Sequence, residues 1–140
     1  MASVLHLKGL EQAYLAGINL ESDTIKLAFM EVGYTPNVGT DSFYSDISGS
    51  VASGSTDQTL ANVDVRIDTG NTRVEVDADN ISVATQTFSS NKVSIYKDTG
   101  TPSTSVVIAT IDIVEGTLNP IGGTVTLTFN AEGIFAINDN

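Results

Sequence analysis

The stretch from Asn91 to Ile113 constrains the fold more than any other part of the chain, because two runs of alternating apolar residues flank a compact turn. The alternating apolar positions are Val93 and Ile95 before the turn, and Val107, Ala109, Ile111 and Ile113 after it. Period-two alternation of β-branched residues is typical of a strand with one buried face. The segment 98–104 between them consists of Asp, Thr, Gly, Pro and Ser, which favour turns. The stretch therefore predicts a β-hairpin near the middle of a sheet.

Strand-like alternation recurs along most of the chain. A first strand is expected at 23–32, where apolar residues occupy every second position from Ile25 to Phe29. Further strands are expected around Val63–Ile67, Val74–Val76, Ile81–Phe88, Val125–Phe129 and Ile134–Ile137. Short strands separated by regularly spaced turns are typical of antiparallel sandwiches and small barrels. The 140 residues are therefore predicted to form one all-β domain, 1–140, an antiparallel β-sandwich or small barrel with one short N-terminal helix.

Residues 4–16 carry the helical periodicity of that N-terminal element. Leu7, Leu10 and Tyr14 recur at the spacing of one helix face, with Ser3 as the expected N-cap. Gly9 within this helix costs about 1 kcal/mol relative to Ala. The helix is therefore expected to depend on tertiary packing.

The middle of the chain holds two less regular segments. Residues 40–47 predict a single helical turn, with Phe43, Tyr44 and Ile47 directed inward. Residues 48–56 read SGSVASGST, and this composition favours a flexible, exposed arm or loop. We therefore expect the 48–56 segment to be available to a partner.

The charge balance restricts the classes of partner. Six Lys and Arg face 17 Asp and Glu, so the formal net charge is −11 and the chain has no basic stripe for a phosphate backbone. No apolar run reaches the roughly 20 residues of a membrane span, and the N-terminus lacks the pattern of a signal peptide. We therefore expect synthesis in the cytosol, with neither nucleic acid nor a membrane as a partner.

Residues that could support catalysis or metal binding are sparse. The chain has no cysteine, and its single histidine, His6, is expected on an exposed or half-buried helix face. Asp77–Asn80 alternates oxygen ligands as calcium loops do, but it lacks their glycine and their later glutamate, and a turn explains it equally well. Carboxylates at Asp64, Asp68, Glu75, Asp77 and Asp79 are expected to gather on one hairpin, either as a solvated face or to meet a basic partner. We expect no enzyme activity, no cofactor and no metal site.

Three stretches together resemble a known group of proteins. The first is HLKGLEQAYLAGINLESDTIKLAFMEVGYTPN at 6–37, the second is TDSFYSDI at 40–47, and the third is IYKDTGTPSTSVVIATID at 95–112. Gly122–Thr126 adds a fourth, shorter match. In order and spacing these stretches are similar to structural virion proteins of tailed bacteriophages and prophages. The segment 62–88 fits that pattern less well, which marks it as a place for a partner-specific surface.

The resemblance implies a capsid decoration (cement) protein, bound to the outer surface of the phage head. It implies the major capsid protein as partner and a homotrimer on the capsid. The expected contact residues are Tyr34, Phe43, Tyr44, Ser48, Gly49, Ser50 and Val51, with the N-terminal helix as a second candidate. Two alternatives remain: a tail or head–tail connector protein, and a module that binds a host glycan or receptor through Tyr34, Phe43 and Tyr44.

Overall fold

The computed structural model describes residues 3–129 and 133–138. Within these residues the strands form three antiparallel sheets, with strand orders β1-β8-β7-β2-β3, β10-β5-β4 and β6-β9. The helices and strands are β1 (Val4–Leu5), α1 (Leu7–Tyr14), β2 (Ile25–Met30), α2 (Tyr44–Ile47), β3 (Gln58–Thr59), β4 (Asp64–Asp68), β5 (Arg73–Asp77), β6 (Ile81–Thr87), β7 (Lys92–Lys97), β8 (Val107–Asp112), β9 (Ile121–Leu127) and β10 (Phe135–Asn138). A short 3₁₀ turn, Ser48–Ser50, follows α2. The expected all-β, sandwich-like fold with a short N-terminal helix is confirmed.

The predicted central hairpin is confirmed as β7 and β8. The two strands pair antiparallel, with Val93 opposite Ile111 and Ile95 opposite Ala109, and β7 is the middle strand of the five-stranded sheet. A register shift follows Ile95, where a bulge brings Tyr96 opposite Val107. Most side chains of both strands are buried, so the five-stranded sheet must be covered on both of its faces.

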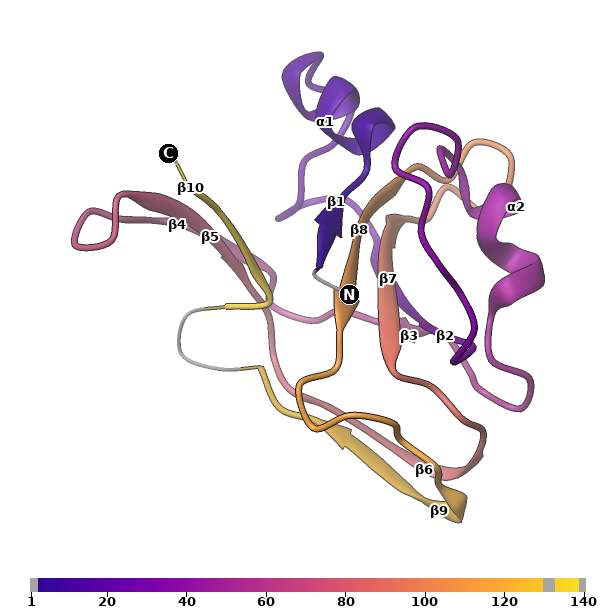
Figure 1. Ribbon diagram of the computed structural model, residues 1–140. Coiled ribbons are helices and arrows are strands. Elements are labelled where there is room, and N and C mark those ends of the chain that lie inside the picture. The colour runs from indigo at the N-terminus through magenta and orange to yellow at the C-terminus, as the bar shows by residue number, and fades with distance from the viewer. Residues whose placement is uncertain (1–2, 130–132, 139–140) are drawn as a thin grey trace.

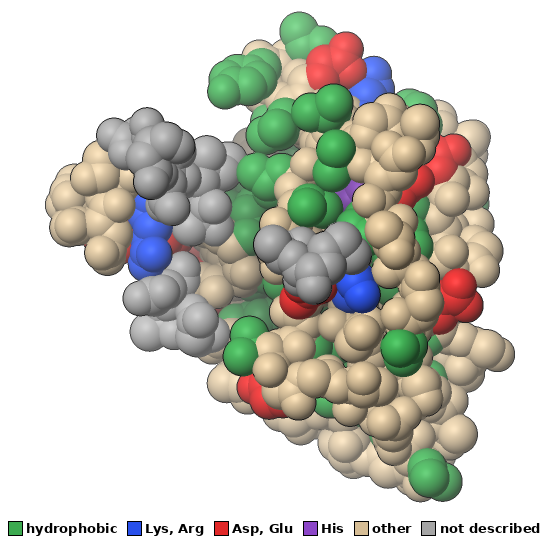
Figure 2. Space-filling model, in the orientation of Figure 1, with side chains coloured by type: hydrophobic (Ala, Val, Ile, Leu, Met, Phe, Trp, Pro, Cys, Tyr) green, Lys and Arg blue, Asp and Glu red, His purple; other side chains and the backbone are tan. Residues whose placement is uncertain are grey.

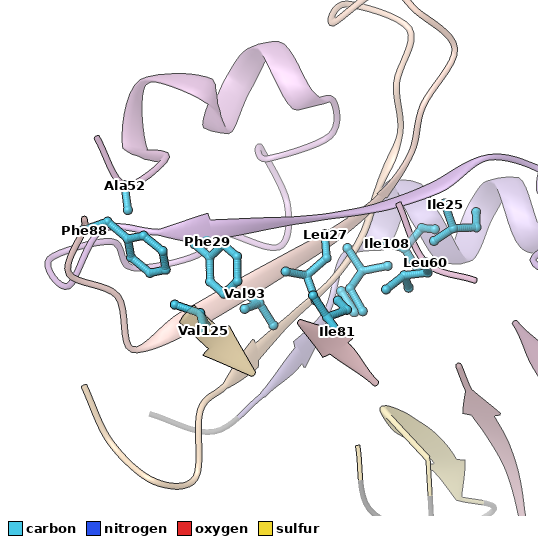
Figure 3. Close-up of a cluster of buried hydrophobic side chains, with 12 residues drawn as sticks. Ile25, Leu27, Phe29, Ala52, Leu60, Ile81, Phe88, Val93, Ile108 and Val125 are labelled. Carbon is cyan, nitrogen blue, oxygen red and sulfur yellow. The ribbon is translucent and has the colours of Figure 1, made fainter. Parts of the chain in front are cut away.

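The main core lies between one face of the five-stranded sheet and the β6–β9 pair (Figures 1 and 3). Phe29 from β2 lies beside Phe88 from the end of β6, with ring centroids 4.7 Å apart. Leu27 on the same strand has no exposed surface, and Ile81 packs in the same cluster. Burying a side chain of this size contributes roughly 1.5–3 kcal/mol to stability. The packing of Phe29 and Leu27 against Phe88 and Ile81 therefore stabilises the contact between the two layers.

A second core covers the opposite face of the same sheet. The cluster consists of Ala28, Met30, Tyr34, Ile47, Tyr96 and Val107, with Tyr44 and Val51 packed against it. Residues 31–56, which include α2, supply the covering layer (Figure 1). Asp46 caps α2, because its Oδ2 accepts hydrogen bonds from the backbone N–H groups of Ser42 and Phe43. The predicted helical turn is therefore present, with Phe43 at its N-cap position.

The β10-β5-β4 sheet projects from the body of the molecule (Figure 1). Its register places Val65 opposite Val76, Ile67 opposite Val74, and Phe135 opposite Val76 on the other side. Residues opposite one another share a face of the sheet. One face of this sheet is therefore apolar, and the charged residues of β4 and β5 lie on the other.

The N-terminus departs from the predicted helix 4–16. Val4 and Leu5 pair with Thr110 and Ala109 of β8, and α1 begins only at Leu7. His6 is the N-cap and makes no side-chain capping bond, so the expected cap at Ser3 is wrong. The strand forms because pairing with β8 satisfies backbone groups that a longer helix would leave on its exposed first turn.

Gly9 explains how α1 lies so close to the sheet. A Cβ at this position would lie 2.8 Å from both the Ile108 Cα and the Val107 carbonyl oxygen. The glycine that weakens the isolated helix therefore allows its backbone to pack directly against β8.

The segment 48–56, for which an arm or an exposed loop was expected, is a loop with several exposed residues, and its middle is hydrogen-bonded to β2 and its flank. The Ser50 carbonyl accepts a hydrogen bond from Glu31 N–H at 2.8 Å, and Ala52 N–H donates to the Phe29 carbonyl at 2.8 Å. Ala52 is buried in the main core. The Gly and Ser residues here permit turns and close approach, whereas Val51 and Ala52 supply the apolar contacts that hold the loop to β2.

Candidate functional site

Of the seven expected contact residues, three pack inward, two are exposed, and Phe43 and Ser50 are half-buried. Tyr34 is 7% exposed, and Tyr44 and Val51 pack against the second core. Ser48 and Gly49 are exposed, at the 3₁₀ turn. This region therefore presents a small polar surface above a structural core.

The aromatic residues proposed for glycan binding have structural partners. The Tyr34 hydroxyl donates to Asp41 Oδ2 at 2.7 Å, and burial together with this carboxylate raises the pKa of Tyr34 above its usual range. The Tyr44 ring lies against the Tyr96 ring, with centroids 4.5 Å apart. Burial, with the nearby Asp57 carboxylate, raises the pKa of Tyr44 to about 12. The Tyr34 hydroxyl and one side of the Tyr44 ring are therefore engaged within the protein.

His6 is fully buried, which corrects the expectation that it is exposed or half-buried. His6 is the first residue after β1, and its backbone N–H donates to the Ile108 carbonyl, which holds it against the sheet. Its Nε2 lies 2.9 Å from Thr110 Oγ1, which lies 2.8 Å from Ser94 Oγ. Among the described residues, Nδ1 has no hydrogen-bond partner. Burial lowers the pKa of His6 below its ordinary value, and the backbone and charge of Asp41 offset only part of this effect.

The lowered pKa of His6 predicts a pH dependence of stability. The unfolded chain binds a proton on this imidazole near pH 6.5, whereas the folded chain does so only at a lower pH. The stability that neutral His6 contributes is therefore complete above the unfolded-state pKa of 6.5. It declines as the pH falls below that value, by at most about 1.4 kcal/mol per pH unit. We expect the free energy of unfolding of the wild type to fall relative to that of His6→Gln as the pH drops below about 6.5, because Gln keeps a polar group near Thr110 and does not titrate.

Urea unfolding at a series of pH values measures this difference, and the Gln variant serves as the control for every other titrating group. Parallel pH profiles for the wild type and the variant would show that His6 binds its proton at the same pH in the folded and the unfolded chain, and would contradict the prediction.

The expected acidic cluster is present on β4 and β5, but arginines organise it. Arg66 Nε lies 2.8 Å from Glu75 Oε2, and its Nη1 lies 3.2 Å from Asp77 Oδ2. Arg73 Nη2 lies 2.7 Å from Glu75 Oε1. The Glu75 side chain is only 6% exposed, so two arginines compensate a buried carboxylate. This face is a connected ion-pair network and therefore differs from the free acidic surface that a basic partner would meet.

The possible calcium loop at Asp77–Asn80 is a turn whose oxygens have protein partners. Asp77 pairs with Arg66, and Asp79 Oδ2 accepts a hydrogen bond from Asn62 Nδ2 at 2.6 Å. Asn80 Oδ1 accepts one from the Phe129 backbone N–H. Within the described ranges, no three acidic or histidine side chains are grouped so that they could hold a metal ion.

A groove of about 600 Å³ lies between α1 and the projecting sheet. Its lining is mostly apolar and comes from β1, α1, the 16–21 loop, β4, β5, β8 and β10. The larger apolar lining residues are Leu5, Leu10, Ala13, Ile18, Leu20, Val65, Val74, Val76, Ile108 and Phe135, and Asn19 and Glu21 add polar surface. Figure 2 shows hydrophobic side chains gathered over α1 and along the hollow beside the projecting lobe. Val65 and Val74 remain 38% and 39% exposed.

The sequence carried a partial signal for this groove. Strict alternation in β4 and β5 places the valines and Ile67 on one face and the charged residues on the other. This segment also falls within 62–88, the region where the resemblance to virion proteins is weakest. Alternation predicts an apolar face but not how much of it the fold covers, so the groove itself was not anticipated.

Comparison with known proteins finds no relative: no family model, no curated protein and no solved structure matches the chain. None of the described helices is both long enough and apolar enough to cross a membrane.

Proposed function

We propose that this chain is a structural virion protein that decorates the outer surface of a tailed-phage capsid. The observation that carries the proposal is the open apolar groove between α1 and the projecting sheet. It provides a surface for a protein partner on an otherwise acidic domain with two packed cores. The N-terminal helix, one of the two contact elements expected from the sequence, forms one wall of the groove.

The charge distribution supports a position away from packaged nucleic acid. Five of the six basic side chains, all within the described ranges, form ion pairs; they are Lys8, Lys26, Arg66, Arg73 and Lys97. Lys92 is 7% exposed and donates to Asn91 Oδ1. With a formal net charge of −11, the protein would be repelled by a phosphate backbone. A position on the outer face of the capsid agrees with this charge. The proposed partner, the major capsid protein, and the proposed bound form, a homotrimer, rest on the resemblance to virion proteins alone.

The copy number per virion tests the proposal. In particles produced from the genome that encodes this chain, quantitative mass spectrometry against the major capsid protein should give hundreds of copies, in proportion to the capsid lattice. A count that matches a single ring, a dozen or fewer, would assign the protein to the tail or to the head–tail connector. Absence from purified particles would reject a virion role.

Deletion of the 48–56 loop is not a suitable test of capsid binding. Ala52 is buried in the main core, and Gly54 lies against the backbone of Thr87. Removing 49–55 would therefore destabilise the domain, and a loss of binding would follow from misfolding. Substitutions in the groove avoid this difficulty.

A further inference from the structure

We propose that the groove between α1 and the β10-β5-β4 sheet binds an amphipathic helix of a partner protein, with its apolar stripe in the groove and basic residues along the flanks. The inference rests on the proposed function only in so far as the groove is a protein-binding site. It names the chemistry of the partner segment, which the capsid assignment leaves open.

The apolar stripe follows from the lining of the groove. Leu10 and Ala13 of α1 form one wall, and Val65 and Val74 of the sheet form the other. Both valines lie on the apolar face of the sheet, opposite the ion-pair network of Arg66 and Arg73. Only apolar side chains of a partner could replace water on this surface without leaving polar groups unpaired.

A helix fits this groove better than an added strand, because the edge of β4 is already occupied. The Val65 backbone N–H donates to Glu21 Oε1 at 3.1 Å, and Glu21 itself lines the groove. A strand that extended the sheet here would have to displace this side chain to form its ladder. A helix satisfies its own backbone and needs only side-chain contact, as in other helix-in-groove complexes.

The negative charge of this protein favours basic residues beside the apolar stripe of the partner helix. Glu21 is the only charged residue among those described in the groove lining. The basic side chains of the protein are engaged in ion pairs, apart from the buried Lys92, and the formal net charge is −11. Lysine or arginine on the occupant would complement Glu21 and this acidic field. A second copy of the chain carries the same negative charge and lacks this complementarity.

The test uses the intact protein and a synthetic helical peptide of about 18 residues, five turns of helix, with leucines on one face and lysines on the other. Fluorescence anisotropy measures its affinity for the wild type and for the double variant Val65→Thr/Val74→Thr. These changes keep the shape, charge and strand preference of the two positions but remove methyl groups from the groove. We expect the double variant to bind about tenfold or more weakly.

Two matched controls separate groove binding from adhesion to an acidic surface. The double variant Val114→Thr/Ile121→Thr changes side chains that are 95% and 88% exposed and lie outside the groove, and it should bind as the wild type does. A peptide of the same composition, with its leucines spread around the helix, should bind at least about tenfold more weakly to the wild type. Circular dichroism and thermal unfolding confirm that each variant is folded.

Three outcomes would overturn the inference. Equal affinity of the Val65→Thr/Val74→Thr variant and the wild type would place binding elsewhere, and equal affinity for the two peptides would reduce it to charge attraction. Self-association of the protein alone, abolished by Val65→Thr/Val74→Thr, would make a second copy the occupant. The copy number per virion is measured without these variants, so the proposed function and this inference can fail separately.

Discussion

Phe29→Ala should lower the free energy of unfolding by about 3–5 kcal/mol. Phe29 has no exposed surface, and its ring lies 4.7 Å from that of Phe88, across the contact between the five-stranded sheet and the β6–β9 pair. Removing the ring loses its transfer free energy and leaves a cavity between two layers that cannot easily collapse. A domain of this size has a total stability of about 5–15 kcal/mol, so the variant should be close to unfolding.

Urea unfolding followed by circular dichroism measures this change. Tyr14→Ala is the matched control, because Tyr14 is also aromatic but is 90% exposed on α1. It should change stability by no more than about 0.5 kcal/mol. A similar small effect for Phe29→Ala would mean that β6 and β9 do not pack on β2 in the way described.

Gly54→Ala should destabilise the protein by about 2–4 kcal/mol. Gly54 has a φ of +87°, where a Cβ atom is strained, and a Cβ built there would overlap the carbonyl oxygen of Thr87. That oxygen belongs to the backbone of β6 and cannot move aside as a flexible side chain would. The loop would have to move away from β6 and withdraw Ala52 from the main core.

Gly49→Ala in the same loop is the control. Gly49 is exposed in the 3₁₀ turn, and a Cβ there would meet no atom within 4 Å. Its replacement should be neutral or stabilise by up to about 1 kcal/mol, through the lower entropy of the unfolded chain. Thermal and urea unfolding of the two variants should therefore diverge. Equal, small effects would show that the whole 48–56 segment is mobile, as its composition suggested.

The strands were predictable because period-two alternation reports directly on burial. The central hairpin and the β4–β5 hairpin lie where the apolar pattern placed them, and the N-terminal helix is present over the shorter range Leu7–Tyr14. Turn chemistry was equally informative at Asp68, whose Oδ1 accepts hydrogen bonds from the N–H groups of Gly70 and Asn71. These features depend on residues close together in the chain, so local preference and final structure agree.

The errors arose where distant residues compete with local preference. Val4 and Leu5 have a helical pattern in sequence but pair with β8, more than 100 positions away. His6 is buried because that pairing places it beside Thr110. Residues 48–56 have the composition of a linker, yet contacts with β2 and β6 hold them in place. Composition indicates how much conformational freedom a segment has in the unfolded chain, but it does not show which distant residues the segment contacts in the folded protein.

The sequence alone was sufficient for the all-β class, the central hairpin and the acidic charge that disfavours nucleic acid, because each depends on composition or local alternation. Only the tertiary structure shows that two arginines pair with carboxylates of the acidic hairpin, that three of the seven expected contact residues pack inward, and that a mostly apolar groove stays open beside α1. These features depend on which faces the fold covers. Alternation along a strand shows that one of its faces is apolar. It does not show whether neighbouring elements cover that face in the folded protein.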